Sequence, residues 1–134
     1  MNVKNILLYL FLLCPFILAA QESESEEPAG ILYELDDGYA NLQIVDGCFH
    51  LFFLNADKEV VLPIYSKALL HYEALAGKDK GNREKCQLTL EGDSLMHPKK
   101  VFHPYAFRVR VILLPEEGSD AEKVVLETEI LRQD

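Results

Sequence analysis

Polar and apolar residues alternate most regularly in residues 106–114. The odd-numbered positions from Phe107 to Leu113 are all apolar, whereas Arg108 and Arg110 lie on the other side of an extended backbone. A period of two residues is typical of a half-buried β-strand. We therefore expect a central strand of a sheet here, with one face in the hydrophobic core.

A second strong signal is Asp46-Gly47, which separates two further alternating runs, residues 39–45 and 48–54. Both turn positions tolerate a positive φ, so the pair predicts a two-residue hairpin, which fixes the strand register. One face of the hairpin is then apolar, with the pairs Ile44–Phe49, Leu42–Leu51 and Ala40–Phe53. The other face is mixed and is expected to be partly solvated, with the pairs Val45–Cys48, Gln43–His50 and Asn41–Phe52.

Further short strands are predicted at residues 31–35, 59–62, 67–74, 85–91 and 122–131. A helix is the alternative for residues 65–75, but the alternation of apolar and polar positions favours a strand. Residues 94–105 are the least regular part of the chain. His97-Pro98 and His103-Pro104 predict an edge or a loop there, because proline cannot donate a hydrogen bond to a strand ladder.

The last hairpin offers charge pairs if residues whose numbers sum to 237 face each other. That register places Arg110 opposite Glu127 and Arg108 opposite Glu129. Each exposed pair is expected to contribute about 0.2–1 kcal/mol.

Seven or eight short strands, and no helical period longer than a turn, predict an all-β protein. We expect a single immunoglobulin-like antiparallel β-sandwich of about seven strands over residues 30–134. About 100 residues are enough to enclose one core. The chain has no tryptophan and no Cys–Trp–Cys spacing, which excludes an antibody-type domain.

The first 20 residues have the order of a secretory signal peptide. A lysine at position 4 precedes an apolar run at residues 6–18, and Ala19-Ala20 offers a small-residue cleavage site. An uncleaved membrane anchor is the alternative, but the run is shorter than the roughly 18 residues of a spanning helix and contains Pro15. We expect an exported protein, periplasmic or extracellular, with no stable membrane span after cleavage. Residues 21–29 carry four glutamates and are expected to form a disordered acidic linker.

The charge balance disfavours nucleic acid as a partner. The whole chain has a formal net charge of −9, and without residues 1–20 it has 12 basic and 22 acidic residues, a net charge of −10. Such a chain repels phosphate backbones. An unknown protein or a small ligand is the partner class that remains.

The exported part keeps two cysteines, Cys48 and Cys86, in a compartment where disulfides persist. The hairpin register places Cys48 on the outer face, whereas Cys86 alternates with Leu88 and Leu90 toward the core. We therefore predict that the two thiols are not bonded to each other, because a bridge requires Cα atoms within about 7 Å.

No catalytic signature is present. The sequence lacks the nucleophile-elbow, zinc-protease and phosphate-loop motifs, and its serines have no evident histidine partner. We expect no enzymatic activity and no cofactor.

A few soft ligands gather in the irregular segment, where Met96, His97 and His103 would suit copper or zinc. A metal site needs at least three converging ligands, and the two His-Pro steps lie on a segment that must curl to join them. We predict no three-ligand cluster and regard these three residues as the only weak metal candidates.

Aromatic side chains are the second group with binding potential. They could line a carbohydrate or peptide groove, although aromatics in a small β-protein often belong to the core. The candidates are Tyr33, Tyr39, Tyr65, Tyr72, Tyr105, Phe102 and Phe107.

Residues 36–64, with their hairpin, aromatic strand, turn and valine-rich return, resemble a group of small exported bacterial proteins. Residues 99–113 also fit this pattern. Some members are similar to accessory proteins of heavy-metal efflux systems, so the resemblance implies a periplasmic β-sandwich. The histidine–glycine clusters of the metal-binding members are absent, and no site residue is carried over.

We expect an exported, non-enzymatic binding or accessory module. A periplasmic metal-binding or metal-efflux accessory protein is one alternative, and an adhesin-like structural domain is another.

Overall fold

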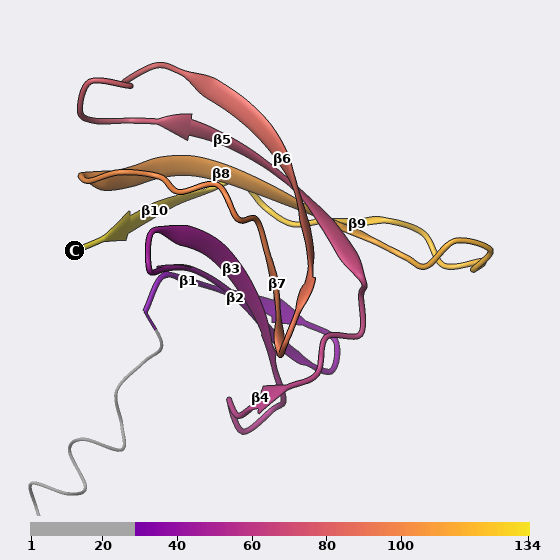
Figure 1. The fold of residues 1–134 in the computed structure, drawn as a ribbon. Coiled ribbons are helices and arrows are strands. Elements are labelled where there is room, and N and C mark those ends of the chain that lie inside the picture. The colour runs from indigo at the N-terminus through magenta and orange to yellow at the C-terminus, as the bar shows by residue number, and fades with distance from the viewer. Residues whose placement is uncertain (1–28) are drawn as a thin grey trace, which may run out of the picture.

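The computed structural model describes residues 29–134. The predicted signal peptide and all but the last residue of the predicted linker lie outside the described residues. The described residues form ten strands and no helix (Figure 1). These are β1 (Ile31–Leu35), β2 (Gly38–Val45), β3 (Cys48–Leu54), β4 (Val60–Val61), β5 (Lys67–Ala74), β6 (Arg83–Glu91), β7 (Ser94–Met96), β8 (Tyr105–Leu114), β9 (Val124–Val125) and β10 (Glu129–Gln133).

All ten strands belong to one antiparallel sheet, in the order β1-β2-β3-β7-β6-β5-β8-β10, with β4 beside β3 and β9 beside β8. The sheet curls into a half-barrel, so that β10 comes back toward β1 and β2 (Figure 1). The all-β prediction is confirmed, but the described residues form ten strands where about seven were expected, because β4, β7 and β9 have only two or three residues each. The immunoglobulin-like sandwich is not confirmed, because the strands form one continuous curled sheet instead of two packed sheets.

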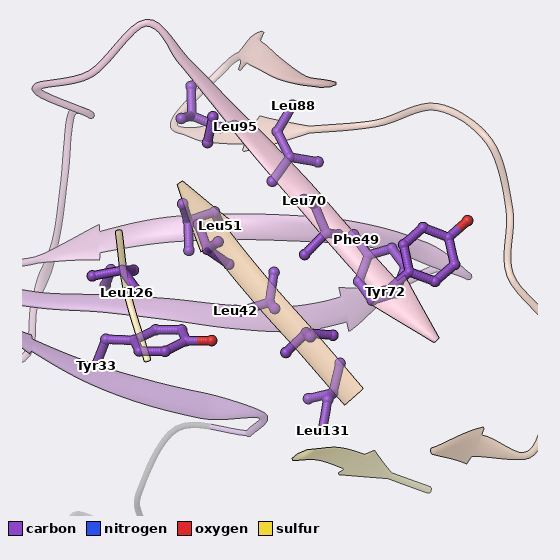
Figure 2. Packing of buried hydrophobic residues seen from close by; sticks show 14 of the residues in the cluster. Tyr33, Leu42, Phe49, Leu51, Leu70, Tyr72, Leu88, Leu95, Leu126 and Leu131 are labelled. Atoms are coloured by element: carbon purple, nitrogen blue, oxygen red, sulfur yellow. The ribbon is translucent and has the colours of Figure 1, made fainter. Parts of the chain in front are cut away.

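The concave face of the sheet is the hydrophobic core. Inward side chains from β2, β3, β5 and β8 meet there, because apolar residues alternate along each of these strands. Leu42, Leu51, Leu70, Val109 and Val111 are completely buried. Figure 2 shows leucines from several strands converging with Phe49 and Tyr72, whose ring centroids lie 4.9 Å apart.

Strand β8 is an interior strand, as predicted, between β5 on one side and β9 and β10 on the other, although it is next to last in the sheet. The strand reading of residues 65–75 is also confirmed, since β5 spans Lys67–Ala74. Leu90, expected in the core, is 52% exposed. The reason is that β5 begins at Lys67, opposite Thr89, so no residue of β5 lies beside Leu90.

The β2–β3 hairpin has the predicted register, with Val45 opposite Cys48 and Ile44 opposite Phe49. Asp46 and Gly47 both have positive φ, at 51° and 81°, as the turn requires. The outer face is less solvated than expected, because Asn41 is 1% exposed. Its amide donates to the carbonyl oxygens of Ala29 and Ile31, at 2.8 and 3.0 Å.

The irregular segment contains a strand that the sequence did not predict. Ser94–Met96 forms β7, which pairs with β3 and β6 and therefore lies inside the sheet, so the prediction of an edge or loop is wrong for these three residues. The prolines at 98 and 104 follow β7 and do not interrupt its ladder. Residues 97–104 form no strand and cover the β2–β3 turn, where the Val101 amide donates to the Gly47 carbonyl.

The last hairpin is antiparallel, as predicted, but its register changes along its length. Strand β9 follows the predicted sum of 237, with Ile112 opposite Val125. Strand β10 is shifted by one residue, so Glu129 faces Val109 and Arg108 faces Ile130. The chain has one extra residue between β9 and β10, opposite β8, and this β-bulge causes the shift. The predicted Arg108–Glu129 pair is therefore wrong.

A side chain of the last strand, Gln133 of β10, hydrogen-bonds to the backbone of β2. The Ile44 amide donates to Gln133 Oε1 at 3.0 Å, and Gln133 Nε2 donates to the Ile44 carbonyl oxygen. Strand β1 begins at Ile31, opposite Leu42, so Ile44 has no β1 neighbour. Gln133 supplies both missing hydrogen bonds and joins β10 to β2.

Candidate functional site

A pocket of about 830 Å³ opens at one end of the half-barrel. Residues 32–39 contribute the end of β1 and the start of β2, residues 53–55 the end of β3, and residues 124–127 and 129 the region of β9 and β10. Val61, Ile64 and Tyr65 complete the lining. We call this the mouth pocket. Its size is within the usual range for small-ligand sites, which are often found in the mouths of β-barrels.

Large apolar side chains are exposed around the mouth pocket. Leu62 and Ile64 are 74% and 71% exposed, and Val60, Val61 and Val125 are between 38% and 51% exposed. Strand β4 has only two residues and pairs with β3 alone, so this segment has no second strand to cover it. We call these five residues the apolar rim; Val61, Ile64 and Val125 line the pocket, and Val60 and Leu62 are their neighbours in the chain. Exposed apolar groups near a pocket are common at binding surfaces.

Aromatic rings line the inner part of the pocket. Tyr33, Tyr39, Phe53 and Tyr65 all belong to the lining, and the rings of Phe53 and Tyr65 are stacked with centroids 5.9 Å apart. Three of the seven aromatic residues predicted as groove candidates therefore meet here. Tyr72, Phe102 and Phe107 line a smaller pocket at the opposite end, and the ring of Tyr105 is stacked on that of His103.

The charged residues of the mouth pocket are all acidic. Its five carboxylates are Glu34, Asp36, Asp37, Glu127 and Glu129, and none of its described lining residues is lysine, arginine or histidine. The Lys58 ammonium lies nearby, 5.5 Å from the centroid of the Tyr39 ring. The pocket therefore combines apolar walls with a negative potential.

Tyr33 carries an unusual polar group. Its side chain is 7% exposed, and its hydroxyl is the one buried side-chain polar atom without a hydrogen-bond partner in residues 29–134. Burial, and secondarily the Glu129 carboxylate, raise the pKa of this phenol far above its usual value near 10. The hydroxyl therefore remains protonated at neutral pH.

The pocket at the opposite end has a volume of about 250 Å³ and a different character. Tyr72 donates a hydrogen bond to Glu84 at 3.0 Å, and the Lys99 ammonium donates to the same carboxylate oxygen at 3.1 Å. The hydrogen bond from Lys99, followed by that from Tyr72, holds the pKa of the Glu84 carboxyl below its usual value. These polar groups satisfy one another.

The weak metal candidates lie in different settings. Met96 faces His50 across β3 and β7, His97 follows β7, and His103 lines the smaller pocket. His50 Nδ1 is 2.9 Å from Ser94 Oγ, so the expectation that no serine has a histidine partner is wrong for Ser94. Within residues 29–134 no group of three or more histidine, cysteine, aspartate and glutamate side chains could hold a metal ion.

On the convex face of β5, Glu73 accepts a hydrogen bond from Arg108 at 3.1 Å and lies 3.5 Å from Arg83. Arg108 therefore pairs with β5 instead of with Glu129. Both pairs have a well-exposed arginine, so their contribution to stability is small.

Cys48 and Cys86 are free thiols in the structure. Cys48 is buried although it lies on the outer face, because its thiol donates to the Pro98 carbonyl oxygen at 3.5 Å beneath the covering segment. Burial, together with the nearby Glu84 carboxylate, raises the pKa of the half-buried Cys86 thiol to about 11.

Sequence reasoning missed the acidic lining, the apolar rim and the unpartnered Tyr33 hydroxyl. The sequence predicts a return strand at residues 59–62, and the structure retains only Val60–Val61 of it, both exposed. The isolated position of Leu62 and Ile64 around Pro63 was the available signal that the strand stops early.

Comparisons with family models, with curated proteins and with solved structures find no match to this chain. In residues 29–134 there is no helix long and apolar enough to cross a membrane.

Proposed function

We propose that this chain is an exported, non-enzymatic binding module that holds a small amphipathic ligand in the mouth pocket. The observation that carries the proposal is the pocket of about 830 Å³ with exposed apolar residues at its rim. An apolar ligand body would cover Val61, Ile64 and Val125, which otherwise face water. Export is inferred from the apolar run at residues 6–18 and the following Ala19-Ala20.

The chemistry of the pocket suits binding better than catalysis. The ionisable side chains of its described lining residues are carboxylates and tyrosines, without the serine, cysteine, histidine or lysine that often serve as nucleophile or general base. Burial raises the pKa of the Tyr33 phenol, so it moves further from neutral pH. These features support a role in holding a ligand without transforming it.

Fluorescence of a neutral apolar dye, N-phenyl-1-naphthylamine, tests this proposal with residues 21–134. We expect one saturable site per chain. Ile64→Lys places a charge on the apolar rim without entering the core and should weaken dye binding at least about tenfold. Ile130→Lys is the matched control, because Ile130 is also exposed, at 47%, but does not line the mouth pocket.

Two results would contradict the proposal. One is the absence of saturable dye binding to the folded protein. The other is an equal effect of Ile64→Lys and Ile130→Lys, which would assign the binding to apolar surface in general.

A further inference from the structure

Resting on the proposed function, we propose that the ligand of the mouth pocket is an organic cation. Its ammonium group lies between the Glu129 carboxylate and the Tyr33 hydroxyl, and its apolar body lies against the rim at Val61, Ile64 and Val125.

The first support is the sign of the charge around the pocket. Five carboxylates and no basic side chain line it, so a cation entering the pocket is attracted from several sides. An anionic head group would be repelled by the same groups. The apolar rim favours an organic ammonium over a metal ion, because a hydrated metal ion gains nothing from contact with valine and isoleucine.

The second support is the unpartnered Tyr33 hydroxyl. A buried hydroxyl without a partner costs free energy, and nearly all such groups in native proteins are satisfied by protein, water or ligand. Figure 2 shows the Tyr33 ring extending from β1 into the core, with its hydroxyl at the inner end and Leu126 beside it. In this conformation the hydroxyl is buried from solvent, so the lone pairs of its oxygen can accept a hydrogen bond from an entering ammonium N–H once the Tyr33 ring turns toward the pocket.

The third support is the position of Glu129. It pairs with Val109, whose side chain is completely buried on the concave face, so the register directs Glu129 toward the same side of the sheet. The Glu129 carboxylate is close enough to influence the ionisation of Tyr33. Glu129 and Tyr33 therefore line the same pocket, one with a charge and the other with a hydrogen-bond acceptor.

The aromatic rings of the pocket lining fit the same ligand. Tyr33, Tyr39 and Tyr65 line the pocket, and a cation within about 6 Å of a tyrosine ring is attracted to the ring face. The Lys58 ammonium already lies 5.5 Å from the Tyr39 ring centroid, which is a contact of this kind.

The test compares three amphipaths that share a decyl chain and differ in the head group: decylammonium, decyl sulfate and neutral decyl glucoside. Each displaces N-phenyl-1-naphthylamine from residues 21–134, at a concentration below its critical micelle concentration. An ionic strength of about 0.15 M limits the reach of distant charges to about 8 Å. We expect decylammonium to bind at least about tenfold more tightly than the glucoside, and the sulfate to bind most weakly.

Variants assign the preference to the two groups. Glu129→Gln and Tyr33→Phe should each reduce decylammonium affinity about three- to tenfold and leave the glucoside affinity unchanged. Asp79→Asn removes the same charge as Glu129→Gln but lines the pocket at the opposite end. It should change neither affinity.

The outcomes separate this inference from the function on which it rests. Equal affinities for the three amphipaths, with the dye still displaced, would overturn the cationic ligand and leave a binding module. An effect of Asp79→Asn as large as that of Glu129→Gln would also overturn it, because the preference would then reflect net charge. Failure of all three amphipaths to displace a dye bound at the mouth pocket would contradict the inference and the proposed function together.

Discussion

Two tyrosines of the core differ in what their hydroxyls touch. Both side chains are nearly buried, at 7% and 9% exposed. The Tyr72 hydroxyl donates to Glu84, whereas the Tyr33 hydroxyl has no partner. The contrast indicates that Tyr33 contributes less to stability than its burial suggests.

Replacing each tyrosine by phenylalanine should therefore give opposite results. Tyr33→Phe removes an unsatisfied hydroxyl and should leave the free energy of unfolding unchanged or raise it by about 1 kcal/mol. Tyr72→Phe removes a hydrogen bond to a partly exposed carboxylate and should lower it by about 1 kcal/mol. Urea unfolding of the two variants measures both changes. A clear loss of stability in Tyr33→Phe would mean that its hydroxyl has a partner in solution.

His50 gives a second prediction at this scale. Burial lowers the pKa of its imidazole, and the Asp46 and Asp93 carboxylates oppose the effect only in part. A folded-state pKa below the unfolded value of about 6.5 means that stability is lost as the pH falls below that value. An NMR titration should find the His50 pKa below 6.5, and His50→Gln should flatten the acid side of the stability profile. A pKa at or above 6.5 would contradict the role of burial.

At the scale of elements, side-chain alternation was enough to locate the longer strands, but not the three-residue strand β7. The β2–β3 register followed from Asp46-Gly47, because a two-residue turn leaves one pairing possible. The register of β10 did not follow from local sequence. A bulge adds one residue, and charge complementarity between Arg108 and Glu129 is too weak to prevent the shift.

The hydrogen bonds between Gln133 of β10 and Ile44 of β2 could not be predicted from the sequence either, since the two residues lie 89 positions apart. Gln133→Leu should lower the free energy of unfolding by about 1–3 kcal/mol, because it leaves the Ile44 amide and carbonyl without partners. Gln87→Leu on the exposed side of β6 is the control and should change stability by less than about 0.5 kcal/mol. Urea unfolding compares the two. Similar small effects in both variants would show that β10 does not need this side chain to close the sheet.

The architecture of the whole molecule was predicted only in part. Alternation determines which face of a strand is apolar, but it does not determine whether two apolar faces belong to two sheets or to one sheet that curls. The short strand β7 decides this here, because it joins β3 to β6 and makes the sheet continuous. Its three residues, Ser94–Met96, carry too little pattern to be recognised. The mouth pocket is a consequence of that curl, so it could not be derived from its residues alone.

The alkaline stability of the molecule follows from groups in both halves of the core. The Cys86 thiol has a pKa raised from 9.0 to about 11, and the phenols of Tyr33 and Tyr72 are raised above 10.0. When the folded-state pKa is higher than the unfolded one, the contribution to stability is complete below the unfolded value and is lost as the pH rises through the folded value. We therefore expect a stability plateau that ends near pH 9.

Thermal unfolding between pH 7 and pH 11 should show a first decline above pH 9, due to Cys86, and a steeper one above pH 10, due to the tyrosines. Cys86→Ala should postpone the onset to about pH 10, because alanine does not ionise. Cys48→Ala is the matched control, because it removes the other free thiol. If the onset remains at pH 9 in Cys86→Ala, or if Cys48→Ala moves it equally, Cys86 does not cause the first decline, and its thiol is more accessible to water than its half-buried position on β6 implies.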